Sequence, residues 1–444
     1  MTEPALDTSL RLEPAEERRV SVLSWVLVLG FIGESLLAKS HVPTLSFSTP
    51  VHVALTAVLG GAIVVAGVGR RRVPLPFPIR LLFFLLFGLA VVSSVYSERF
   101  VTFNVVFALV WVVHFTAVWW GVPGLLGGAR FSARADLGFW VFTFVILTSL
   151  VFYTESRHDR AEGFFDSATH LARLSALAVV CAFSEWLVAA RHRRPWMLLI
   201  VPALALLALS RTRASIGAAL VGCLAVLLSH TLARERVYRT RAAVVTAAVF
   251  LFLITAFFLV DLEVVDTDNV LDFLRLRGGV SEVLGPRMRI WASGFDRLDE
   301  VGLLGEGFSA KFAGPTATKW GVEYPTYDWR EIVDPHNMLV TTALQNGLVA
   351  MVLLGLLVGG IGVAVLRLDP RPRAMALGVL TSGLVFGLFD GNWFIAFSPV
   401  DRISMIILAL MLACPGEPED DVRPGATGPP GRRPAHDEHA DRGA

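Results

Sequence analysis

Long apolar stretches alternate with short polar connections over most of the chain. A helix needs roughly 17–25 mainly apolar residues to cross a bilayer core, where the backbone must satisfy its own hydrogen bonds. The pattern therefore predicts an all-α membrane protein of about 12 transmembrane helices. We expect these spans near residues 20–38, 51–69, 79–96, 101–120, 137–153, 171–190, 195–210, 214–230, 242–260, 338–366, 373–391 and 398–414.

Both ends of the chain differ from this apolar region. Residues 1–19 are polar and of mixed charge, and residues 415–444 are rich in Pro, Gly, Asp and Arg. Neither end can bury enough apolar surface to fold. We therefore expect a polytopic membrane domain over residues 20–414 between two disordered tails, 1–19 and 415–444.

Arginines recur in alternate connections of the membrane domain. Cytoplasmic loops carry an excess of Lys and Arg, so these connections and both tails are predicted to face the cytoplasm, and the protein is predicted to lie in the cytoplasmic (inner) membrane. The remaining loops then face outward. The arginine-bearing positions are Arg18 and Arg19, Arg70 to Arg72, Arg130 with Arg134, and residues 191–194, 234–241 and 367–373.

One outward-facing connection, between the ninth and tenth spans, is too long for a simple loop. It covers residues 261–337, whereas structureless loops longer than about 12–15 residues are uncommon. Pro286 suits the first turn of a helix, and an apolar stripe at helical spacing follows it. We expect short helices here that lie on the bilayer surface or cap a cavity. The stripe consists of Ile290, Trp291, Phe295 and Leu298.

Composition agrees with lipid as the solvent. Only 17% of the residues are charged, whereas about 25% are charged in a soluble domain. The net charge of +1 provides no basic excess for binding nucleic acid. All three cysteines lie in apolar runs, which predicts neither a disulfide nor thiol chemistry. Three charged residues lie inside predicted spans, where charges are usually paired or functional, and the sequence leaves both interpretations open. They are Glu34, Arg173 and Glu185.

Arginines on the predicted outward side run against the charge bias. Arg160 lies in the 154–170 loop, Arg211 and Arg213 lie in a short turn, and Arg287 lies in the long loop. A guanidinium is always charged and matches phosphate oxygens with a planar fork. Contact with lipid headgroups explains many single arginines at a membrane boundary. Together, these arginines indicate a receptor for a membrane-bound phosphate or pyrophosphate.

A histidine precedes the tenth predicted span, in Asp334-Pro335-His336-Asn337. Histidine is the side chain most easily poised as a base near neutral pH, although a histidine at a helix start is more often structural. The segment "HNMLVTTALQNGLVA" resembles the signature of the O-antigen ligases and the related O-antigen polymerases. That signature is His, then Asn, Ser or Gln, nine residues, Gly, two residues, then Gly, Thr or Tyr. His336, Asn337 and Gly347 match it, and Ala350 departs from it.

Further segments resemble the same family in the same order. In "GPRMRIWASGF", Arg287 stands four residues before Trp291, and "GLLGEGFSAKF" follows. "LALSRTRASIG" resembles the Ser-Arg at the outer end of a family helix and contains Arg211. "RAEGFFDSATHLA" resembles the family's Arg-x-x-Gly-Phe segment, with Arg160 aligned and His170 where Asn is usual. The resemblance covers roughly residues 150–370.

The resemblance implies a GT-C-like O-antigen ligase fold and an outward-facing active site for glycosyl transfer. The donor would be a glycan on a polyprenyl-pyrophosphate carrier, and the acceptor a hydroxyl of a lipid, glycan or protein. Arg287 and Arg211, with Arg160 and Arg213, would bind the pyrophosphate. His336 would take the proton from the acceptor hydroxyl, which attacks the anomeric carbon with inversion. Asn337, Asp334 and Trp291 are candidate supporting residues.

Neither a metal nor another cofactor is expected. A pyrophosphate is already a good leaving group, so fixed positive charge near it is the main electrostatic need. Asp266, Asp268 and Asp272 have a weak cation-binding spacing that favours a solvated face instead. Two alternative functions stay open: an O-antigen-polymerase-like enzyme that joins repeat units, and, from a different class, a polytopic solute transporter.

Overall fold

The computed structural model describes residues 20–40, 49–68, 75–96, 101–127, 129, 131–154, 161–165, 167–188, 193–231, 298, 303–307, 337–389 and 398–413. These residues are helical apart from turns and one isolated bridge between Ser40 and Phe165. The chain divides after Cys414, and residues 415–444 lie outside the described part. The helices are α1 (Val22–Leu37), α2 (Thr49–Gly67), α3 (Phe77–Tyr96), α4 (Val101–Thr116), the π-helix η1 (Ala117–Gly121), α5 (Val122–Leu126), α6 (Phe131–Val151), α7 (Ala168–Val188), α8 (Arg193–Leu209), α9 (Arg213–Thr231), α13 (Met338–Leu366), α14 (Pro370–Phe389) and α15 (Pro399–Leu412).

The helices coincide with the predicted spans wherever the structure describes them. Within the described residues, 8 spans are long and apolar enough to cross a membrane, and α1 and α8 contain shorter apolar helices. The predicted ninth span, at 242–260, lies outside the described residues. The structure thus confirms an all-α, multi-pass membrane protein, while the number of twelve spans and the orientation of the termini stay predictions.

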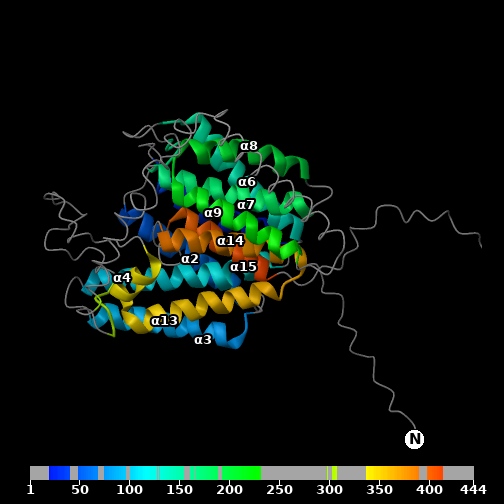
Figure 1. Cartoon of the computed structure of the whole chain (residues 1–444). Helices are drawn as coiled ribbons and strands as arrows, with labels where there is room; N and C mark the ends of the chain where they lie inside the picture. Colours follow the sequence, from blue (N-terminus) through cyan, green and yellow to red (C-terminus); the bar gives the residue numbers. More distant parts are fainter. Residues whose placement is uncertain are drawn as a thin grey trace, which may run out of the picture. The chain divides into compact units, whose positions relative to one another are not determined.

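Small residues allow the central helices to pack closely. Figure 1 shows α9 beside α14 and α3 beside α13, and α7 packs against both α8 and α9. A Cβ atom on Gly222 of α9 would lie 2.2 Å from Ser382 Oγ of α14, and one on Gly378 would lie 2.7 Å from side-chain atoms of Val180 and Val226. Close backbone approach of this kind is the usual way in which helices associate in lipid.

Helix α15 is enclosed by the other helices. It has 14 residues, all of them buried, and it packs against α1, α5, α7, α14 and η1. At 1.5 Å per residue it is about 21 Å long, shorter than the roughly 30 Å of a bilayer core. The last predicted span, 398–414, thus corresponds to a short helix that is buried among the others.

A network of charges joins α15 to α1 and α2. Arg402 is 0% exposed, and its guanidinium donates to Glu34 Oε2 at 2.5 Å, to the Phe31 carbonyl, and to Thr56 Oγ1 at 2.9 Å. It also lies 4.0 Å from the centroid of the Phe31 ring. The other carboxylate oxygen of Glu34 is hydrogen-bonded to His52 Nδ1. The charge of Glu34 within a span is therefore a paired one.

Arginines of the predicted cytoplasmic side bind the ends of neighbouring helices. Arg134, at the start of α6, donates to the Leu410 carbonyl at 3.0 Å and to the Gly127 carbonyl at 2.7 Å. Arg371, at the start of α14, forms an ion pair with Glu185 at 2.9 Å, and the nearby Arg373 donates to Ser229 Oγ at 3.1 Å. These contacts join helix ends that the alternation of arginines places on one side.

A further buried arginine lies against an aromatic ring. The Arg173 guanidinium is 5.8 Å from the centroid of the Phe386 ring. Arg173 thus has an aromatic neighbour, while Glu34 and Glu185 each form an ion pair with an arginine.

We predict that Arg402→Met strongly destabilises the protein, because it leaves the Glu34 carboxylate buried without its main cation. Breaking a buried ion pair from one side costs about 3–5 kcal/mol. The measurement is thermal unfolding of the purified protein in detergent. The double variant Glu34→Leu, Arg402→Met should recover most of the loss. Arg80→Met, which changes an exposed arginine on α3, is the control and should leave Tm within about 1 °C.

Candidate functional site

The structure describes part of the predicted site. Arg211, Arg213 and Asn337 lie within it. The predicted site residues outside the described part are Arg160, Arg287, Trp291, Asp334 and His336. The described part of the site therefore consists of the helix ends that precede or follow these residues.

Arg211 occupies a constrained turn between α8 and α9. Its φ of 49° is in the left-handed region, which residues other than glycine seldom adopt. The turn is held by hydrogen bonds from the Arg211 amide to the Ala208 carbonyl at 3.0 Å and from Ser210 Oγ to the Leu207 carbonyl at 2.6 Å. Arg213 begins α9, and both arginines are partly exposed. The predicted short turn is confirmed, and it places two arginines at the amino end of α9.

The segment 161–165 docks on this turn. The amide of Ala161 donates to the carbonyl of Leu209 at 3.1 Å, and Leu209 is the last residue of α8. Gly163 has a φ of 60°, and a Cβ there would lie 2.6 Å from Ser149 Cβ, so the segment also fits closely against α6. Ala161 directly follows Arg160 in the sequence. Two of the family-like segments, "RAEGFFDSATHLA" and "LALSRTRASIG", are therefore in direct contact through Ala161 and Leu209.

Helix α13 is broken near its start. Gly347 has φ 89° and ψ 168°, which separates a short half-helix, residues 338–346, from the long remainder. Residues 303–307 lie against the break. The amide of Glu306 donates to the Leu344 carbonyl at 2.9 Å, and the amide of Gly307 donates to the Gln345 carbonyl at 2.8 Å. Carbonyls that the break deprives of a helical partner are thus satisfied by another part of the chain.

Two glycines make this contact possible. A Cβ on Gly347 would lie 1.8 Å from the Leu303 carbonyl oxygen, and a Cβ on Gly305 would lie 2.5 Å from the Gly347 amide nitrogen. The φ of Gly305, 75°, is also positive. The glycine of "HNMLVTTALQNGLVA" and the glycine-rich segment "GLLGEG" are therefore two sides of one contact, which the sequence did not indicate.

Asn337 caps the half-helix and ties it to α14. Its Oδ1 accepts from the amides of Leu339 at 3.0 Å and Val340 at 3.3 Å, and its Nδ2 donates to the Leu388 carbonyl at 3.3 Å. Asparagine is among the preferred residues at a helix start for this reason. Asn337 thereby fixes the point at which the chain leaves His336 and enters α13.

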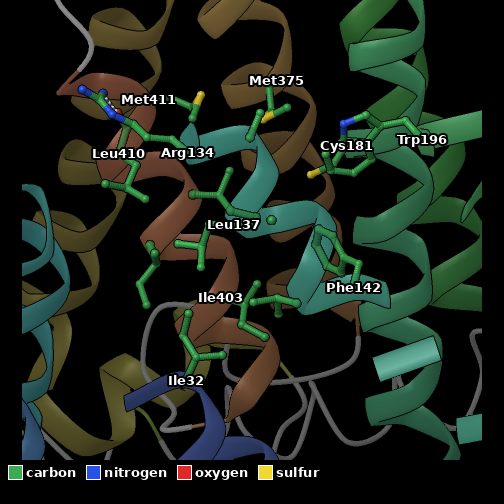
Figure 2. Close-up of a pocket in the computed structure, with 15 residues that line it drawn as sticks. Ile32, Arg134, Leu137, Phe142, Cys181, Trp196, Met375, Ile403, Leu410 and Met411 are labelled. Atoms are coloured by element: carbon green, nitrogen blue, oxygen red, sulfur yellow. Dashed lines mark hydrogen bonds between the residues drawn. The ribbon is translucent and has the colours of Figure 1, made fainter. Parts of the chain in front are cut away.

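An apolar pocket lies elsewhere, among α6, α7, α14 and α15. It has a volume of about 420 Å³ including its open side, and its lining includes Leu137, Phe142, Ile403 and Met411. Figure 2 shows Arg134 at one end of it, where this arginine binds helix carbonyls. The site residues that the structure describes, Arg211, Arg213 and Asn337, are not among the residues that line this pocket.

Residues 197–355 match the family described as O-antigen ligase. This confirms the resemblance to the O-antigen ligase family. The O-antigen ligase match begins in α8 and ends in α13, so it includes both the Arg211 turn and the break at Gly347. Comparison with curated proteins finds no match. A chain in a solved structure described as "Structural coordination of polymerization and crosslinking by a peptidoglycan synthase complex" is similar with a TM-score of 0.42 and 14% identity, over 77% of this chain and 98% of that chain.

We predict that Gly347→Ala destabilises the protein, because the added methyl group meets the Leu303 carbonyl and the backbone keeps a positive φ. Strain of this kind costs about 1–3 kcal/mol before the steric contact is counted. Gly355→Ala is the matched control, since it lies in the same helix and its Cβ would meet nothing within 4 Å. Thermal unfolding in detergent measures both. Equal Tm values for the two variants would contradict the contact.

Proposed function

We propose that the protein is an O-antigen-ligase-like glycosyltransferase of the cytoplasmic membrane. It moves a glycan from a polyprenyl-pyrophosphate carrier to an acceptor hydroxyl at the outer face, with inversion and without a metal. The observation that carries this proposal is the O-antigen ligase match over residues 197–355, which contains Arg211, Arg287 and His336. The same match favours group transfer over solute transport.

The proposed donor site is centred on the turn between α8 and α9. Arg211 and Arg213 lie at the amino end of α9, where the helix dipole also favours an anion. The segment that follows Arg160 is bound to the same turn through Ala161. Together with Arg287, these arginines bind the pyrophosphate of the donor. They stabilise the negative charge that develops on the pyrophosphate as it leaves.

The proposed acceptor site is at the start of α13. His336 takes the proton of the acceptor hydroxyl while that oxygen forms a bond to the anomeric carbon. The bond from this carbon to the pyrophosphate oxygen breaks, that oxygen keeps the electron pair, and the arginines stabilise its negative charge. Asn337 supports the histidine by fixing the helix start that follows it, and Asp334 and Trp291 are further candidates from the sequence. A polymerase of repeat units would use the same groups with a lipid-linked glycan as acceptor.

We expect substitutions of the arginines to show that these residues bind phosphate and do not merely anchor helices at the membrane surface. Arg287→Lys keeps the charge but loses the bidentate fork, so it should impair transfer. Arg287→Ala and Arg211→Ala should each lower the turnover about 10²–10³-fold, as loss of a transition-state donor does. Glycan transfer is measured in a deletion strain that expresses each variant. Arg367→Ala, at the opposite end of α13, is the control. If both alanine variants accumulate to the level of the parent protein and are fully active, the pyrophosphate binds elsewhere.

We expect His336→Ala to bind undecaprenyl pyrophosphate but to lose about 10²–10⁴-fold in transfer, the usual cost of a missing general base. His336→Gln should be as inactive as His336→Ala, because the glutamine amide can form the hydrogen bond of the imidazole but cannot accept the proton of the acceptor hydroxyl. Transfer by the parent should also fall as the pH drops through the imidazole range. A Gln variant with parent-like transfer would assign His336 a structural role and leave the base to be found elsewhere.

A further inference from the structure

One buried hydroxyl joins three segments at the break in α13. Ser93 lies near the end of α3 and is 0% exposed. Its Oγ donates to the Gln345 carbonyl at 2.6 Å and accepts from the Gly307 amide at 3.1 Å. The Gly307 amide also reaches the Gln345 carbonyl. Ser93 therefore binds both partners of the contact between residues 303–307 and the half-helix 338–346.

The half-helix depends on such contacts for its orientation. An intact helix would transmit the direction of the long part of α13 to its first residues, but the non-helical backbone at Gly347 interrupts this. Among the described residues, Val340 and Leu344 of the half-helix pack against Leu298, and hydrogen bonds attach both of its ends to other segments. Asn337 attaches the amino end to the Leu388 carbonyl, and residues 303–307 with Ser93 hold the carbonyl end.

We propose that Ser93 is a positioning residue for glycan transfer. By holding residues 303–307 on the carbonyl end of the half-helix, its hydroxyl sets the direction of the helix that begins directly after His336. This role rests on the proposed function, in which His336 is the general base. A misplacement of about 1 Å at a reacting group can cost about 100-fold in rate, so a contact distant in sequence from the histidine can control turnover.

The experiment compares two adjacent serines of α3. Ser93→Ala removes the bridge, whereas Ser94→Ala removes a hydroxyl that is equally buried and that, within the described part of the chain, donates to the Ala90 carbonyl of its own helix at 2.7 Å. Ser93→Thr keeps a hydroxyl at the bridge. Each full-length variant is measured for glycan transfer in the deletion strain, for binding of undecaprenyl pyrophosphate, and for hydrogen exchange of residues 303–307 and 338–346.

The expected results distinguish an effect on the position of the half-helix from an effect on donor binding. Ser93→Ala should transfer about 10–100-fold less glycan, bind undecaprenyl pyrophosphate within about twofold of the parent, and exchange amides of the two segments about tenfold faster. Ser94→Ala should match the parent in all three measurements, and Ser93→Thr should restore transfer. If Ser93→Ala fails to accumulate in the membrane, Ser93→Cys tests the same contact with a weaker hydrogen-bonding group of similar size.

Two outcomes would overturn the role of Ser93. Parent-like transfer by Ser93→Ala, together with an inactive His336→Ala, would remove the positioning role and leave the proposed function intact. Loss of undecaprenyl pyrophosphate binding in Ser93→Ala would show that the serine acts on the donor site or on folding. In contrast, parent-like transfer by His336→Ala would overturn the proposed function itself, and the positioning role with it.

Discussion

A membrane provides no water for the polar groups of the backbone, so each amide and carbonyl must find its partner within the protein. Helices meet this requirement by themselves, and the departures from helix are therefore the informative places. At Gly347 the freed carbonyls accept from residues 303–307, and at the end of α8 the Leu209 carbonyl accepts from Ala161. Each irregular segment is thus matched to a second one. Both pairs join segments that are far apart in the sequence and that belong to the family-like motifs.

Buried charged side chains are likewise paired with groups elsewhere in the protein. Arg402 and Glu34 satisfy each other, with His52 and Thr56 completing the network. Arg134 and Arg373 bind carbonyl groups at the ends of neighbouring helices, where a cation also complements the helix dipole. The arginine bias of alternate loops, which predicts orientation, therefore also has a structural part in closing helix ends. Orientation and packing are encoded in the same residues.

Hydropathy predicted the helices well because it measures the preference of side chains for lipid, which is the dominant solvent here. It could not tell a helix that faces lipid from one enclosed by protein, and so it gave no sign that α15 is buried among the other helices. The break at Gly347 lies inside a continuous apolar run and is hidden for the same reason. Pairings such as Arg402 with Glu34 depend on tertiary contacts across 368 positions. Within the site, the sequence singled out Gly347 and Arg211, but Ser93 is one serine in an apolar helix and carries no local signal.

The enclosed position of α15 has a consequence for the order in which the protein is assembled. A segment about 21 Å long that carries Asp401 and Arg402 at its start gains little by entering lipid alone. Its partners on α1 and α2 are made first by the ribosome, so for most of synthesis Glu34 has His52 and Thr56 of α2 as neighbours but lacks Arg402. The polar network is therefore complete only when the last described helix has been made.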